Sequence, residues 1–284
     1  DLPLPTDGSS ALSSPMTSPV KASRSSVFRV KETAGDLQLT RLSASTLATL
    51  LTNEKNQEYF IEAGGLENTY KLIAVTHNPG MRASLACILN YLSKSPENQA
   101  RIVDGGGLEA VFDLASSGDE KVCFHAVNCC KRLASLPGNQ AKWPEEGLRA
   151  LLGWLDSFHL MKLQMLTLDT ITHLCEDNEL NRTRFVEMGG VVKVAPYLDM
   201  ERYDDDVRLL AAKCITKLAA SEVARPHLAI PQVLDSFRSL VEHGMVVNDT
   251  EQLRAALDAM CMLADCAENK LRLMEAGDVE VIFH

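Results

Sequence analysis

A short phrase of residues returns about every 42 positions along this chain, and no other feature constrains its fold as strongly. The phrase opens on Asn and closes on glycine followed by an apolar residue, and its clearest copies run from Asn56 to Leu66 and from Asn98 to Leu108. Weaker copies occupy 139–148, 181–191 and 269–279. A period of this length is typical of a solenoid of stacked helical units, and solenoids commonly hold another polymer along their surface.

Each unit is predicted to contain three helices. In the unit that starts at Asn98 they are expected over 98–104, 108–116 and 120–135. The glycines between the first two helices allow positive φ and close backbone approach, so the chain can turn sharply without a long loop. Third helices carry apolar residues at helical spacing, such as Leu163, Leu166, Ile171 and Leu174. Since one unit could not bury this stripe alone, the units are expected to stack.

The spacing and residue types together resemble the armadillo repeat, in which a short first helix ends in a glycine and a long third helix ends just before the next Asn. The resemblance covers nearly everything after residue 36 and implies an all-α, right-handed armadillo-type α-solenoid over 37–284. Five full repeats are expected near 56–97, 98–138, 139–180, 181–223 and 224–268, preceded by an unpaired helix over 37–51 and followed by a partial repeat over 269–284. The fifth repeat diverges most, because other residues replace its Asn and its glycine pair.

Composition agrees with one elongated helical unit. The 284 residues are 46% hydrophobic and only 5% aromatic, which fits an Ala- and Leu-rich helical stack better than a β-rich core. A net charge of −10 argues against nonspecific nucleic-acid binding, which needs a basic face to neutralise phosphates. Because the chain starts at Asp1 and stops inside a repeat, it is interpreted as a fragment of a longer protein.

Residues 1–36 form a Ser/Pro-rich segment that is too polar to build a core, and it is interpreted as a tail or linker. It holds four basic residues and no acid between Lys21 and Lys31, against an acidic body. Ser14 and Ser18 each precede a proline and are candidate phosphorylation sites. The segment is therefore a plain linker, a tail that folds back onto the solenoid, or a partner-binding motif tuned by phosphorylation.

The eight cysteines show no metal or redox signature, since no Cys-x-x-Cys pair occurs with a matching His pair. Free cysteines in helical cores act as small hydrophobes and indicate a reducing compartment. No signal peptide and no apolar run approaching a membrane span is present. We expect a cytoplasmic protein with no metal, no cofactor and no direct membrane insertion.

Catalytic constellations are lacking as well. The glycine pairs precede helices in repeat after repeat and lack the Lys-Ser/Thr of a phosphate-binding loop. His125 and His173 fall in third helices, where a structural histidine is expected more often than a catalytic base. The acidic run over 201–206 precedes a third helix and is expected to complement its N-terminal dipole rather than bind a metal. The chain is not expected to be an enzyme.

Armadillo proteins generally hold extended peptides in a groove lined by their third helices. In the importin-α type of groove, Asn residues clamp the peptide backbone and Trp residues one turn earlier stack on lysine stems. The third helices are aligned here on six leucines that are expected to be buried: Leu50, Leu92, Leu133, Leu174, Leu218 and Leu263. Only Asn90, two residues before its leucine, matches the Asn ladder, and Trp143 and Trp154 are expected in a first and a second helix. Recognition of a nuclear-localisation signal is therefore not expected.

Basic residues dominate the same positions along the middle of the expected groove. The candidate groove residues are Asn90 at one end, Lys131, Arg132, His173, Lys213 and Lys217, with Asp169 interrupting the row. The arrangement resembles the basic grooves with which β-catenin-like proteins hold acidic, extended segments. Lysine and arginine there would pair with carboxylates or phosphoserines, and the amide of Asn90 could fix a peptide bond. The alternative is that these lysines merely solvate an exposed helix face.

These observations favour a non-enzymatic protein-interaction module in a eukaryotic cytoplasmic scaffold or adaptor, with an acidic extended or helical protein segment as its partner. Two alternatives remain open from the sequence. The array could be a regulatory domain that restrains a catalytic domain of a larger enzyme, as armadillo arrays sometimes do beside kinase or NAD-cleaving modules. It could also be a structural component of a cytoskeletal or ciliary assembly.

Overall fold

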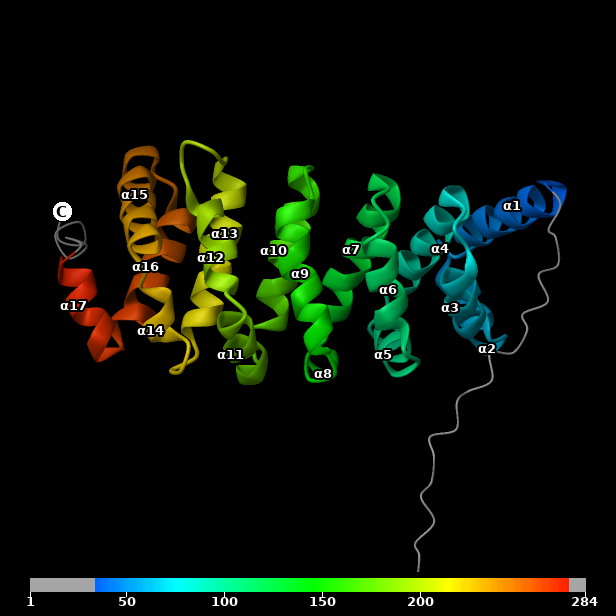
Figure 1. The fold of residues 1–284 in the computed structure, drawn as a ribbon, viewed down its shortest axis with the longest axis horizontal. Helices are drawn as coiled ribbons and strands as arrows, with labels where there is room; N and C mark the ends of the chain where they lie inside the picture. Colours follow the sequence, from blue (N-terminus) through cyan, green and yellow to red (C-terminus); the bar gives the residue numbers. More distant parts are fainter. Residues whose placement is uncertain (1–33, 276–284) are drawn as a thin grey trace, which may run out of the picture.

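The computed structural model describes residues 34–275, and in this range helices follow one another along a single elongated stack (Figure 1). Most of the predicted tail, with Ser14, Ser18 and their possible contact with the solenoid, lies outside the described residues, as does the end of the partial repeat. The stack opens with one helix that has no first or second helix before it in the described chain, α1 (Ala34–Leu50). It closes with the first helix of a further repeat, α17 (Ala267–Glu275).

Five three-helix repeats lie between these two helices, as expected for an armadillo-type solenoid. The first helices are α2 (Glu54–Glu62), α5 (Pro96–Asp104), α8 (Pro137–Gln140), α11 (Glu179–Glu187) and α14 (Arg225–Leu228). The second helices are α3 (Gly65–Val75), α6 (Gly107–Ala115), α9 (Glu145–Ser157), α12 (Gly190–Val194) with the 3₁₀ helix η1 (Ala195–Leu198), and α15 (Pro231–Val247). The third helices are α4 (Pro79–Leu92), α7 (Glu120–Ser135), α10 (Met161–Leu174), α13 (Asp205–Ala219) and α16 (Thr250–Ala264).

The third helices form one continuous layer, in which α1 packs on α4, α4 on α7, α7 on α10, α10 on α13 and α13 on α16. Leu92, Leu133, Leu174, Leu218 and Leu263 are fully buried between the layers, as the sequence alignment of the third helices requires. The alignment was wrong in α1, where Leu50 is 51% exposed and the neighbouring Leu51 is buried instead. The error arose because α1 packs on a third helix on one side only, so its leucines Leu42, Leu47 and Leu50 lie on its open side while Ala44 and Ala48 are buried.

The recurring Asn of the phrase is a buried tie between repeats. Asn181 Nδ2 donates to the carbonyl of Leu174, at the end of the preceding third helix, at 3.1 Å and to the carbonyl of Gln140, in the preceding first helix, at 3.0 Å. Asn139 Nδ2 makes the same pair of bonds to Leu133 and Gln99 at 3.1 and 3.4 Å. Each amide thus satisfies a helix-end carbonyl that has no partner within its helix, in a place that water does not reach. This explains why the Asn returns with the repeat.

The two glycines of the phrase meet different constraints. Gly64, Gly106 and Gly189 have φ of +75°, +77° and +80° and cap the second helices, as expected for turn residues. The next glycine is required for space, because a Cβ on Gly190 would lie 2.2 Å from the ring of Phe185. Gly190 itself has no positive φ, since the left-handed conformation belongs to Gly189.

Candidate functional site

The third helices present their remaining side chains away from the first and second helices, and we call this surface of α4, α7, α10, α13 and α16 the third-helix face. All seven predicted groove residues lie on these helices. Asn90 is on α4, Lys131 and Arg132 are on α7, Asp169 and His173 are on α10, and Lys213 and Lys217 are on α13. The structure shows, however, that most of them bind one another or bind acids that the sequence analysis did not select.

Lys131 and Asp169 form an ion pair across the α7–α10 contact, with Nζ and Oδ2 2.6 Å apart. The second oxygen of Asp169 lies 3.6 Å from His173 Nε2, one turn further along α10. The side chains of Lys131 and Asp169 are 36% and 23% exposed, so the pair sits at the surface rather than in the core. Asp169 therefore does not interrupt a row of free cations, since it is the partner of one of them.

Two further ion pairs bind the lysines of α13 to neighbouring repeats. Lys217 Nζ lies 2.7 Å from Glu176, just after α10, and Lys213 Nζ lies 2.7 Å from Glu251 at the start of α16. The hydrogen bond from Lys217 lowers the pKa of the Glu176 carboxyl. Neither acid was predicted from the sequence, although Glu176 follows Asp169 by seven residues, which is close to two helical turns.

Asn90 is 8% exposed, and its side-chain amide is held inside the chain. Its Oδ1 accepts a hydrogen bond from Arg132, which also donates to the backbone carbonyl of Asn90 at 2.9 Å. Its Nδ2 lies 3.1 Å from His125 Nδ1. Because the amide oxygen is taken by Arg132, Nδ2 donates and Nδ1 of a neutral His125 accepts. Burial lowers the pKa of His125, which favours this neutral state. Both the oxygen and the nitrogen of the Asn90 side-chain amide are therefore hydrogen-bonded within this chain.

Two lysines near the ends of third helices, one of them in the turn after α4, lie over aromatic rings instead of pairing with carboxylates. Lys94 Nζ lies 4.8 Å from the ring centre of Tyr91, and Lys162 Nζ lies 4.5 Å from the ring centre of Phe124. Neither lysine forms an ion pair with any residue of the described range. They were not predicted from the sequence because Lys94 lies in the turn after α4 and Lys162 at the start of α10, outside the positions counted from the leucines. The spacing offered a signal, since Lys162 precedes Asp169 by seven residues.

The two tryptophans do not contribute to this face. Trp154 is in the second helix α9, as expected, whereas Trp143 lies in the turn between α8 and α9 rather than in a first helix. Both are buried, at 5% and 2% exposure, and both pack against Phe112 of α6. They serve the contact between the second and third repeats.

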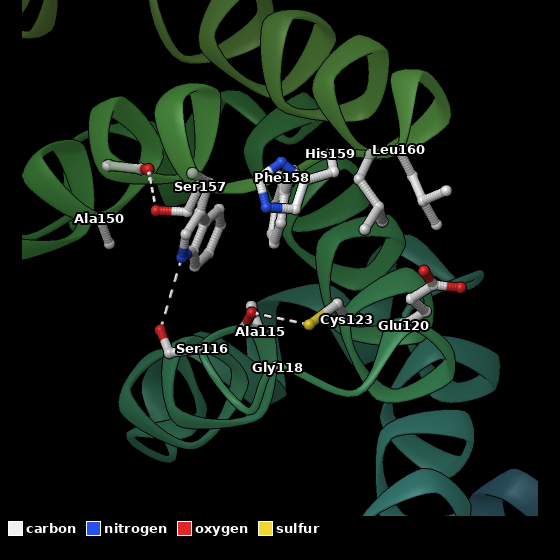
Figure 2. A pocket seen from close by; sticks show the side chains of 13 residues that line it. Ala115, Ser116, Gly118, Glu120, Cys123, Ala150, Ser157, Phe158, His159 and Leu160 are labelled. Atoms are coloured by element: carbon white, nitrogen blue, oxygen red, sulfur yellow. Dashed lines mark hydrogen bonds between the residues drawn. The ribbon is translucent and has the colours of Figure 1, made fainter.

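A separate hollow of about 450 Å³ lies between the second and third repeats, where the second helices lead into the third (Figure 2). Its lining includes Trp154, which donates from Nε1 to Ser116 Oγ at 3.5 Å, and Cys123, whose Sγ donates to the Ala115 carbonyl at 3.0 Å. His159 also lines the hollow. In the described chain its ring forms no hydrogen bond with the hydroxyl of Ser116 or with the thiol of Cys123. The hollow therefore contains no assembled nucleophile and base.

Within residues 34–275, no three His, Cys, Asp or Glu side chains are grouped as metal ligands would be. None of the helices described in that range has the length and apolar character that a membrane crossing requires.

Comparisons with known proteins give related sequences and a clear fold. No protein-family model matches the chain. Vacuolar protein 8 of Candida albicans is 26% identical over 187 residues, which cover 65% of this chain and 31% of that protein. Vacuolar protein 8 of Schizosaccharomyces pombe is 30% identical over 128 residues, which cover 45% of this chain and 21% of that protein. The chain thus spans less than a third of the curated relatives that it matches.

Solved structures match over most of the chain. An engineered protein superposes with a TM-score of 0.74 at 22% identity, covering 88% of this chain and 60% of its own. A designed armadillo repeat protein has a TM-score of 0.70 at 18% identity, and the match covers 82% of this chain and 97% of the designed protein. Another designed armadillo repeat protein, in complex with the peptide (KR)4, has a TM-score of 0.68 at 18% identity. That match covers 81% of this chain and 93% of the designed protein. The fold predicted from the repeated phrase is confirmed.

Proposed function

We propose that this armadillo-repeat solenoid is a non-enzymatic protein-interaction module, a scaffold or adaptor that holds an extended partner segment along its third-helix face. The observation that carries the proposal is the unbroken layer from α4 to α16, which presents side chains of adjacent repeats in register. An extended peptide repeats its side chains at regular intervals and can therefore contact successive helices in the same way. The designed armadillo repeat protein in complex with (KR)4 supports peptide binding as a use of this fold.

The partner segment is proposed to be acidic. The face carries Lys131, Lys213 and Lys217, and their side chains are 36–43% exposed. Exposed ion pairs contribute only about 0–1 kcal/mol each, so exchanging an internal carboxylate for one of the partner costs little. We do not propose nucleic acid as a partner, because the chain as a whole is acidic and would repel the phosphates. Cytoplasmic localisation stays a prediction from sequence.

To test the proposal, peptides that bind the whole chain are selected from a random displayed library. Binding of the selected peptides to two variants of the chain is then measured. Lys131→Glu with Lys217→Glu changes the third-helix face, and Lys55→Glu with Lys71→Glu places the same charges on α2 and α3. We expect selected peptides rich in Asp and Glu that bind the second variant and the unmodified chain but not the first. Peptides that bind both variants equally would place the interaction on another surface.

A further inference from the structure

The N-terminal end of the stack carries an apolar surface that no described helix covers. α1 packs on α4, and none of the described helices lies beyond it in the stack (Figure 1). Leu39, Leu42 and Leu50 of α1 are between 51% and 67% exposed. At 3.6 residues per turn these three positions fall within about a quarter of the helix circumference, so they form one stripe. Apolar stripes on terminal repeats of solenoids call for a cap.

A hollow of about 290 Å³ continues this surface between α1 and the first repeat. Its mainly apolar lining includes Leu47 of α1, Phe60 of α2, Leu72 of α3 and Leu85 of α4. Leu47 precedes Leu50 by three residues, so the two are neighbours on the helix surface. The exposed leucines of α1 and the hollow therefore form one continuous surface, which we call the N-terminal apolar end.

The rim of the hollow is acidic. Glu62 at the end of α2 and Glu67 in the first turn of α3 are both exposed, and the turn between them lines the hollow. Neither carboxylate forms an ion pair within the described chain, not even Glu67 with Lys71 one turn later. Arg41, the only cation in the sequence of α1, lies instead against Gly80 at the start of α4. The rim thus offers two carboxylates to a cationic group.

The sequence directly before α1 has the complementary composition. It contains Phe28, the only aromatic residue before α1, together with Val30, in a segment otherwise rich in Ser and Pro. Arg29 and Lys31 alternate with these two residues, and no acid occurs over 8–31. Successive side chains of an extended chain point to opposite sides, so one such segment can present an apolar side and a basic side. Apolar and cationic groups are what the hollow and its rim lack.

The length of chain between Phe28 and α1 matches the distance to the hollow. Six residues lead from Phe28 to Ala34, the first residue of α1, and they reach about 20 Å when extended. The part of α1 that lines the hollow, from Thr40 to Leu47, lies about 9–20 Å along the helix axis from Ala34. A chain that reverses at the start of α1 can therefore bring Phe28 to the nearer part of the hollow. The short tether also gives the segment a high effective concentration there.

We propose that residues 28–31 of this chain bind the N-terminal apolar end and cap the solenoid. Phe28 enters the hollow, Val30 covers the leucines of α1, and the long side chains of Arg29 and Lys31 reach the carboxylates of the rim. This inference is independent of the proposed function, because it concerns the end of the stack and not the third-helix face.

Hydrogen exchange of the whole chain, measured by mass spectrometry, tests the cap. Phe28→Ser with Val30→Ser removes its apolar contacts, and Leu12→Ser with Val20→Ser makes the same chemical change earlier in the sequence. We expect the first variant to speed exchange in α1 and in the turn between α2 and α3 about threefold or more, because an uncovered helix opens more often. The second variant is expected to exchange as the unmodified chain does.

A charge exchange tests the ionic contacts separately. Arg29→Glu with Lys31→Glu is expected to speed exchange in the same segments, because four like charges then meet at the rim. Adding Glu62→Lys with Glu67→Lys to that variant is expected to restore the protection, as in a double-mutant cycle between groups in contact. If the protection is not restored, the proposed position of the segment is wrong.

The remaining outcomes would also overturn the cap. Unchanged exchange in Phe28→Ser with Val30→Ser would show that the segment does not cover α1. Equal acceleration by Leu12→Ser with Val20→Ser would show that no particular segment is bound. Protection of α1 that falls on dilution, together with a dimer in sedimentation velocity, would identify a second copy of the chain as the occupant.

Discussion

Gly189 and Gly190 are neighbours in the sequence, but different forces exclude a side chain from each. Gly189 has φ of +80°, a conformation that L side chains rarely adopt, while nothing lies within 4 Å of the place where its Cβ would be. Gly190 has no such backbone angle, and its Cβ would meet the ring and the carbonyl oxygen of Phe185 at 2.2 and 2.6 Å. The pair lets the second helix start close against the first.

Gly190→Val is expected to lower the free energy of unfolding by about 1–3 kcal/mol, because the fully buried Phe185 has no free space into which to move. Chemical denaturation followed by circular dichroism measures the change. Gly153→Ala in α9 is the control, since nothing lies within 4 Å of its Cβ position and an alanine in a helix is favoured over glycine by up to about 1 kcal/mol. Equal effects of the two substitutions would contradict the steric account.

At the scale of elements, the buried amides of Asn139 and Asn181 join their first helices to the end of the preceding third helix and to the first helix before it. Asn181 is 2% exposed and donates to two carbonyls of the preceding repeat, one on its first helix and one at the end of its third helix. Removing its side chain leaves the Leu174 carbonyl without a donor in a place that excludes water, whereas the Gln140 carbonyl still accepts from the Trp143 backbone N–H. An unsatisfied buried carbonyl costs more than the loss of an exposed hydrogen bond. The contact between repeats thus depends on one polar side chain as well as on apolar packing.

Asn181→Ala is therefore expected to destabilise the chain by about 1–3 kcal/mol in the same denaturation experiment. Asn68→Ala on α3 is the matched control, because Asn68 is exposed and its change is expected to stay within about 0.5 kcal/mol. A loss for Asn181→Ala no larger than that of the control would show that the amide does not tie the repeats.

The elements were more predictable from the sequence than the contacts between them. The expected helix over 120–135 coincides with α7, because an apolar stripe and a capping Asp119 are local signals. The pairing of Lys131 with Asp169 was not predictable, because it depends on how far α10 is displaced along α7, which no local pattern specifies. The buried Leu51 was missed for a related reason, since the open side of α1 also carries leucines.

At the scale of the whole molecule, the main contacts of the described chain join elements of the same repeat or of adjacent repeats, and within the layer each third helix packs on the third helix before it and the one after it. Stability in such a solenoid is approximately a sum of repeats and of the contacts between adjacent repeats. A ligand that lies across several third helices therefore opposes their local opening, because it binds only the closed arrangement. The location of a partner can accordingly be read from the helices that it protects.

Hydrogen exchange of the whole chain, measured by mass spectrometry with and without a saturating acidic peptide, is the most direct test of the claim that the third-helix face is the binding surface. The account predicts slower exchange in several adjacent third helices among α4, α7, α10, α13 and α16, with the second helices α6 and α9 less affected. Protection confined to first or second helices, or no protection anywhere in the described chain, would contradict it.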